Sequence, residues 1–273
     1  MLDFLWKGLL RRPPFKGQNF LFNYLFKKNF FQKKLVTVKA LHSNFRINGD
    51  TATWIGAKIV YTGDYEPELK KVFRSHIKKG DHILDIGANI GFHTLFFAEL
   101  VGPTGKVTAF EPVPHNFEAL NKNIMLNPLH HIVTKNVALG AKNETIAISA
   151  DQESENPGAF NLFDQTGDVL INCHIGDELL QQEERVDLIK IDVEGYEGFV
   201  IQGLVRSIAK HQPIIIFEYD RFYHQKTGLP EDYIYSVLSG LGYNLQYISS
   251  QGLHPLESFQ QIQSANILAL PHD

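Results

Sequence analysis

The residues best suited to chemistry lie where an apolar stretch ends at Asp85 and a glycine-rich turn begins. The turn reads Asp85-Ile-Gly87-Ala-Asn89-Ile-Gly91 and leads into a predicted helix over 91–101. Glycines let a backbone approach a ligand closely, and the start of a helix offers free N–H groups. We therefore predict a loop that binds a cofactor. Asp85 would brace the backbone of the loop and hold an amino-acid group at one end of that cofactor. The alternative is a tight strand-to-helix turn that binds nothing.

A second acid, Glu111, ends the next predicted strand, 20 residues after Gly91. An acid at this position can bind both hydroxyls of a ribose. The turn is shorter than the dinucleotide pattern G-x-G-x-x-G, and no Gly-Lys-Ser/Thr phosphate motif is present. These features favour S-adenosylmethionine as the cofactor, with an NAD-dependent oxidoreductase as the alternative.

Asn136 and Ala138 follow the third predicted strand. Asn136 could bond the edge of an adenine while Ala138 packs against the ring, but a loop asparagine often satisfies nearby backbone instead. Lys190 alternates with apolar residues in a later strand and is either a paired core charge or part of the site.

Three further acids follow predicted strands and are catalytic candidates. Asp192 and Glu194 are two residues apart, so along extended chain they point to the same side. One of them could accept a proton or orient a nucleophile, although acids also cap helices. Glu218 ends a fully apolar strand, where a buried acid without a partner is costly. His93 and His115 are weaker candidates, because each could be an ordinary hydrogen-bonded histidine.

Strands and helices alternate from residue 81 onward, which predicts an α/β fold with a mostly parallel sheet covered by helices on both faces. The candidate acids and glycines all follow strands, and ligands bind at the carboxyl ends of such strands. Residues 141–184 depart from this alternation of strands and helices. They contain a predicted strand pair near Thr145–Ser149 and a polar loop over Asp151–Gly158. The predicted strands are 82–86, 106–111, 131–138, 186–191, 213–218, 243–248 and 265–270, and the predicted helices are 67–78, 91–101, 114–126, 197–209 and 231–241.

Residues 1–34 differ from the rest of the chain in composition. They carry eight Lys/Arg, one acid and nine aromatic residues, and Pro13-Pro14 and Gly17 divide them into short amphipathic helices. Residues 35–63 alternate in polarity, which predicts antiparallel strands that form a cap. We place the domain boundary between 1–64 and 65–273. The first 34 residues could lie on an anionic membrane, or their aromatics could pack on the catalytic domain or on a second copy of the chain in a homo-oligomer.

The overall composition is that of a folded globular protein. A single cysteine, Cys173, fits a reducing compartment, and no apolar run of 18 residues is present. Asp3 and the Arg11-Arg12-Pro13-Pro14 stretch argue against a secretory signal. We therefore predict a cytoplasmic protein, with peripheral contact to the inner face of the membrane left open, and no nucleic-acid partner.

Four motifs together resemble the FkbM-type S-adenosylmethionine-dependent methyltransferases. They are Asp85-Ile-Gly-Ala-Asn-Ile-Gly91, Phe110-Glu-Pro112, Val137-Ala-Leu-Gly140 and Lys190-Ile-Asp-Val-Glu-Gly195, and Phe217-Glu218 adds to them. The resemblance covers residues 65–270. It implies a class I methyltransferase sheet of seven strands, the last one antiparallel, and methyl transfer to a hydroxyl, often on a sugar.

The resemblance also implies roles for particular residues. Asp85, Gly87, Asn89, Gly91 and Glu111 would bind the cofactor, and Asp192 and Glu194 would lie at the active site. The expected activity is O-methylation of a sugar in a glycan or lipid-linked saccharide. A non-sugar natural product as the acceptor, and a non-catalytic docking module, remain alternatives. Methyl transfer from a sulfonium needs no metal, so we predict none, with magnesium at Asp192 and Glu194 as the alternative.

Overall fold

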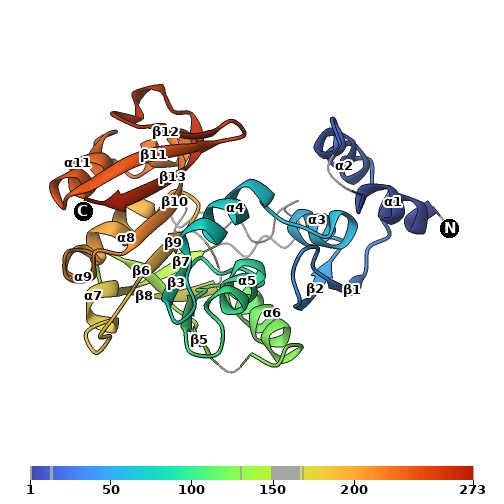
Figure 1. The fold of residues 1–273 in the computed structure, drawn as a ribbon, viewed down its shortest axis with the longest axis horizontal. Helices are drawn as coiled ribbons and strands as arrows, with labels where there is room; N and C mark the ends of the chain where they lie inside the picture. The colour runs from blue at the N-terminus through green and yellow to red at the C-terminus, as the bar shows by residue number, and fades with distance from the viewer. Residues whose placement is uncertain (1, 13–14, 130, 149–166, 168, 273) are drawn as a thin grey trace.

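A single large sheet forms the centre of the molecule (Figure 1). The computed structural model describes residues 2–12, 15–129, 131–148, 167 and 169–272. Within them, eight strands lie in the order β12-β11-β13-β10-β9-β3-β4-β5. Their bounds are β3 His82–Ile86, β4 Lys106–Phe110, β5 Ile132–Lys135, β9 Leu188–Ile191, β10 Ile214–Asp220, β11 Tyr243–Ser249, β12 Gly252–Pro255 and β13 Ser264–Pro271.

The pairing of these strands confirms the predicted fold class. Strands β3, β4, β5, β9 and β10 run parallel, and β13 is antiparallel to both of its neighbours. The last strand is therefore reversed, as expected. The short edge strand β12 pairs with β11 as a hairpin and brings the sheet to eight strands.

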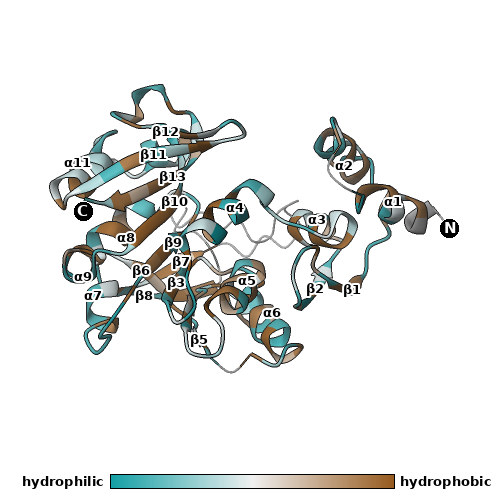
Figure 2. Ribbon diagram, in the orientation of Figure 1, coloured by the Kyte–Doolittle hydropathy of each residue, from teal (hydrophilic) through white to brown (hydrophobic). Residues whose placement is uncertain are grey.

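Both faces of the sheet are covered, so the central strands β3 and β9 are buried along their whole length and are mostly hydrophobic (Figure 2). Alternate residues serve opposite cores: Ile189 and Ile191 contact one cluster, whereas Leu188 and Ile216 contact the other. The first cluster includes residues of α8 (Glu197–Gly203), α9 (Val205–His211) and α11 (Tyr233–Gly240). The second includes residues of α4 (Pro67–His76) and α5 (Phe92–Val101), and α6 (Pro114–Met125) packs beside them through Leu120.

A second, three-stranded sheet has the order β6-β8-β7 and contributes to the first core. Its strands are β6 Ala138–Gly140, β7 Glu144–Ile148 and β8 Val169–Ile175, and α7 (Gly176–Leu179) follows. The predicted strand over 131–138 is therefore wrong as a single element. The Asn136 side chain bonds the Glu111 and Pro112 carbonyls, and the chain leaves the large sheet between β5 and β6. The strand pair expected near Thr145 is β7 with β8, and the polar loop over 151–158 lies outside the described residues.

The predicted helix over 197–209 is also two helices, α8 and α9, which meet at Leu204. Gly203 lies so close to β6 that an added Cβ would be 2.0 Å from the Gly140 carbonyl oxygen.

The N-terminal region contains the two predicted short helices, α1 (Leu2–Leu10) and α2 (Gln18–Lys27), and one hairpin, β1 (Leu35–Lys39) with β2 (Arg46–Asp50). The expectation of strands throughout 35–63 is wrong, because residues Trp54–Thr62 form helix α3. The Thr53 side chain accepts a bond from the Gly56 amide, which is a typical N-cap. An almost wholly buried helix has apolar residues on all sides, and this hides the helical period from sequence inspection.

The remaining short elements are α10 (Arg221–Lys226) and the 3-10 turn η1 (Phe259–Gln261). None of the helices in the described ranges is both long and apolar enough to span a bilayer.

Candidate active site

A cavity of about 390 Å³ opens at the carboxyl ends of β3, β4, β9 and β10. Its volume is in the range of small-molecule sites. Seven of the ten predicted site residues line it: Gly87, Asn89, Glu111, Ala138, Asp192, Glu194 and Glu218. The structure thus brings together residues from separate parts of the sequence.

The glycine loop after β3 is held against its neighbours by backbone contacts. Gly87, Asn89 and Gly91 all have positive φ angles, of 79°, 50° and 90°. The amides of Gly87 and Ala88 both donate to the Phe110 carbonyl. A Cβ on Gly87 would lie 1.8 Å from the carbonyl oxygen of Asp192, so only glycine fits there.

Glu111 fixes the other side of the loop. Its carboxylate accepts bonds from the Asn89 amide at 2.7 Å and the Val113 amide at 2.9 Å. Burial raises the pKa of Glu111 to about 7, although these amides act to lower it. The cavity wall beside it is apolar, formed by Phe110, Val113, Val137, Ala138 and Leu139. An acid next to an apolar wall suits a ribose attached to a flat base.

Lys190 is a paired core charge at the floor of the cavity. Its Nζ lies 2.9 Å from the Gly87 carbonyl oxygen, 3.2 Å from Asp192 and 3.5 Å from Asp85. Burial alone would lower the pKa of Lys190, but the carboxylates of Asp192 and Asp85 raise it above its ordinary value. The lysine therefore stays charged and joins the glycine loop to β9.

Three predicted cofactor residues do not line the cavity. Asp85 is fully buried and accepts a 2.6 Å bond from the Thr94 hydroxyl, so it braces the loop from beneath. Gly91 precedes α5, where a Cβ would lie 2.5 Å from Leu120 of α6. The Asn136 side-chain amide donates hydrogen bonds to two backbone carbonyls. This agrees with the alternative expectation, in which the asparagine satisfies nearby backbone.

The opposite end of the cavity is acidic. Burial acts to raise the pKa of Asp192, but Lys190 and other neighbours act to lower it. The lowering outweighs the effect of burial, so the pKa of Asp192 lies below its ordinary value. Burial and the charge of Asp192 raise the pKa of Glu194 to about 7. Burial and the charges of Asp192 and Glu194 raise the pKa of Glu218 to about 9. Near neutral pH, Asp192 is therefore ionised, Glu194 is close to its midpoint and Glu218 holds a proton.

Helix capping, the alternative role for Asp192 and Glu194, is not seen, because the N-cap of α8 is Tyr196 and no side chain bonds the helix start. Glu197 instead stabilises the loop that precedes the helix. Its carboxylate accepts bonds from the Val193 and Gly195 amides, both at 3.1 Å. Asp192 and Glu194 face the cavity instead, and Glu194 is held in the left-handed region with φ of 53°.

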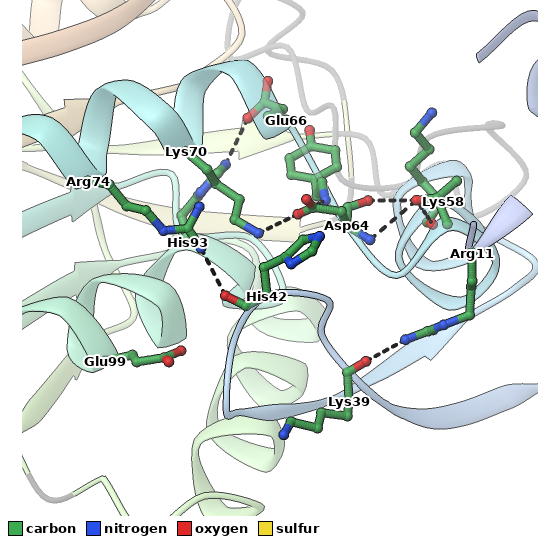
Figure 3. Close-up of polar contacts among 12 residues, drawn as sticks. Arg11, Lys39, His42, Lys58, Asp64, Glu66, Lys70, Arg74, His93 and Glu99 are labelled. Carbon is green, nitrogen blue, oxygen red and sulfur yellow. Dashed lines mark hydrogen bonds and ion pairs between the residues drawn. The ribbon is translucent and has the colours of Figure 1, made fainter. Parts of the chain in front are cut away.

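Sequence inspection missed three cavity residues that precede the first strand of the large sheet. Trp54, Tyr65 and Glu66 all line the cavity. Glu66 bonds Nε2 of His93 at 2.8 Å, and Figure 3 shows this pair at the start of α4. Glu66 could have been predicted, because it is an acid directly before Pro67, at the start of a predicted helix. Nothing in the spacing pointed to Trp54.

The histidine candidates have different surroundings. His93 lines the main cavity, and its buried Nδ1 has no hydrogen-bond partner. His115 lies at a neighbouring cavity between β2 and α6. No group of three or more His, Cys, Asp or Glu side chains within the described ranges is placed to hold a metal ion.

The volume of the cavity and the residues that line it suit S-adenosylmethionine. The apolar wall suits an adenine, Glu111 suits a ribose, and the acidic end suits a sulfonium cation and an amino group. The strand order, the glycine loop after β3 and the acid after β4 together define a class I methyltransferase.

Comparison with known proteins identifies the family. The sequence model of the FkbM methyltransferase domain matches residues 85–245, more than half of the chain. The chain belongs to the FkbM methyltransferase domain family, whose cofactor is S-adenosylmethionine.

Individual relatives are distant. The chain is 26% identical over 153 residues to the hexuronic acid methyltransferase AglP of Haloferax volcanii, a match that covers 55% of this chain and 61% of the relative. It is 26% identical over 144 residues to Methyltransferase 1 of Beauveria bassiana, covering 45% of this chain and 57% of the relative. The chain thus spans less than two thirds of the length of either. The crystal structure of methyltransferase FkbM from Methylobacillus flagellatus superposes with a TM-score of 0.46 and 18% identity, over 78% of this chain and 52% of that one.

Proposed function

We propose that the chain transfers the methyl group of S-adenosylmethionine to a neutral hydroxyl of a saccharide. The observation that carries this proposal is the crowding of Glu66, Asp192, Glu194 and Glu218 on one cavity. Carboxylates accept hydrogen bonds from hydroxyl groups, so an acidic wall suits a substrate with several hydroxyls.

The bound cofactor supplies a methyl group on a positively charged sulfur. The protein must hold the acceptor oxygen in line with that methyl group and exclude water. Positioning of this kind can supply roughly 7–11 kcal/mol in ideal cases. Trp54 and Tyr65 cover the cavity from the N-terminal side and serve to exclude water.

A carboxylate must take up the proton that the hydroxyl loses. Glu194, with a pKa of about 7, is the best matched general base at neutral pH. Asp192 is ionised but already paired with Lys190, so we assign it the orientation of the hydroxyl. Glu218 holds a proton and can donate a hydrogen bond to an acceptor oxygen.

The charge of the site favours a neutral acceptor group. A carboxylate on the acceptor would be repelled by ionised Asp192 and by the ionised fraction of Glu194, whereas a neutral hydroxyl would not. The relative that methylates a hexuronic acid supports a sugar as the acceptor. We therefore place the acceptor among saccharides and the reaction at a hydroxyl.

Mass spectrometry of reaction mixtures with S-adenosylmethionine tests this proposal. The panel holds neutral glycosides, the matching uronic acids and a phenolic natural-product analogue. We expect methylation of neutral glycosides, with the uronic acids slower by about tenfold, the effect of roughly 1.4 kcal/mol of repulsion. Methylation of the phenol alone, or of uronic acids in preference to neutral sugars, would contradict the proposal.

A further inference from the structure

Helix α2 presents two different faces. Phe22 and Leu25 are buried on one side, and the ring centroid of Phe22 lies 5.9 Å from that of Trp54 on α3. On the other side, Phe20 is 77% exposed and Tyr24 is 50% exposed. The aromatic residues of this segment therefore divide between a packing role and an outward-facing one.

The outward face also carries positive charge. Phe20, Tyr24, Lys27 and Lys28, which we call the aromatic–basic face, are all exposed and lie within about one third of the helix circumference. The surrounding sequence strengthens the charge, because residues 4–49 contain ten Lys/Arg and neither Asp nor Glu. Leu5 and Leu35 in the same region are 60% and 70% exposed.

The fold holds this region firmly in place. Arg11 donates to the Lys39 and Val60 carbonyls, and Arg74 of α4 donates to the His42 carbonyl (Figure 3). Phe31 stacks on Tyr61 of α3 with ring centroids 3.8 Å apart. Helices α1 and α2 lie at the end of the molecule opposite β11–β13 (Figure 1). The four side chains of the aromatic–basic face are all exposed there.

We propose that the aromatic–basic face binds the surface of an anionic lipid membrane. Lysines next to exposed aromatic residues on one helix face are the pattern of helices that lie in the membrane interface. Exposed Leu5 lies on α1, the helix next to α2, and an aliphatic side chain there can enter the boundary between head groups and acyl chains but cannot stack on nucleic-acid bases (Figure 1). The observations therefore favour lipid over nucleic acid as the partner.

This surface is close to the cavity. The Trp54 indole, which lines the cavity, donates to the Asn23 side chain of α2 at 3.1 Å. A membrane docked on α2 would bring a lipid-linked acceptor to the cavity wall. The lipid binding itself does not depend on the identity of the acceptor, so the two proposals can fail separately.

Co-sedimentation of the full chain with vesicles tests the proposal. The probes are vesicles of phosphatidylcholine with one quarter phosphatidylserine, and vesicles of phosphatidylcholine alone. We expect binding to the anionic vesicles that weakens with salt, and little binding to the neutral ones. Lys27→Glu with Lys28→Glu should weaken binding by about 30-fold or more, since each lysine near such a surface adds roughly fivefold. Phe20→Ser with Tyr24→Ser should weaken it by about tenfold or more.

A matched control exists on α10, where exposed Phe222 lies 4.5 Å from the Lys226 ammonium. Phe222→Ser with Lys226→Glu should leave vesicle binding unchanged. All these changes are on exposed side chains, and the unfolding temperature of each variant confirms that it is folded. Equal loss in the control, no binding to anionic vesicles by the wild type, or tight binding to a single-stranded oligonucleotide in place of vesicles would each overturn the proposal.

Discussion

The two ends of the cavity are built on opposite principles. At the β3–β4 end, Glu111 and the glycine loop are satisfied by the fold itself, through bonds from the Asn89 and Val113 amides. At the β9–β10 end, Asp192, Glu194 and Glu218 crowd together and shift one another's pKa values. The first end is organised before any ligand arrives, whereas the second holds like charges that raise the energy of the folded protein.

This difference indicates a division of labour. A preorganised end suits a cofactor that is the same in every reaction cycle. Crowded carboxylates with separated pKa values are typical of places where protons move. The cost of the acidic end is tolerated because Lys190 neutralises part of its charge and ties it to the glycine loop.

The largest expected effect follows from removing the proton acceptor. Glu194→Gln keeps the shape of the side chain and should lower turnover by about 10²–10⁴-fold. The affinity for S-adenosylhomocysteine, measured by calorimetry, should change little. Asp192→Asn should also lower turnover. If both variants turn over normally, the acidic end is not the reactive end.

The next effect concerns the cofactor end. Glu111→Ala removes charge-assisted hydrogen bonds to the ribose, worth roughly 1.5–3 kcal/mol each. The Kd for S-adenosylhomocysteine should rise by about 10- to 150-fold. Asn136→Ala, whose side chain faces backbone and not the cavity, is the comparison variant and should bind nearly as well as wild type. Unchanged affinity in Glu111→Ala would remove that residue from the site.

The pH dependence of turnover gives a smaller effect. Glu194 must be ionised to accept a proton, and its pKa is about 7. Turnover should therefore rise by about tenfold between pH 6 and pH 8, following the fraction of ionised Glu194. The same titration in Glu194→Gln should lose this rise. A profile that falls with pH, or one identical in the variant, speaks against Glu194 as the base.

The smallest effect is on stability. The pKa of Glu218 is about 9 when folded, above its ordinary value of 4.5. The folded state therefore binds more protons than the unfolded state, and stability falls as pH rises from about 4.5 to about 9. Glu218→Gln should raise the free energy of unfolding at pH 8 by at least about 1 kcal/mol, measured by urea denaturation. At pH 4 the gain should vanish, and a gain equal at both pH values would show that charge is not the cause.

The sequence predicted the parts of the molecule that depend on local pattern. Apolar strands followed by acids or glycines located β3, β4, β9 and β10 and seven cavity residues. The failures arise where tertiary contacts decide. The buried helix α3 has no polar face to reveal its period, and the Asn136 side chain bonds backbone carbonyls of the segment that follows β4. Trp54, Tyr65 and Glu66 line the cavity although they precede every strand of the large sheet, so only tertiary contacts bring them there.

A crystal structure with S-adenosylhomocysteine tests the division of labour most directly. We predict that the ribose hydroxyls contact Glu111 and that the adenine lies against Val113, Val137 and Leu139. The sulfur should point toward Asp192, Glu194 and Glu218, with room between for an acceptor hydroxyl. A ligand in the reverse orientation, with its adenine among these acids, would contradict the account.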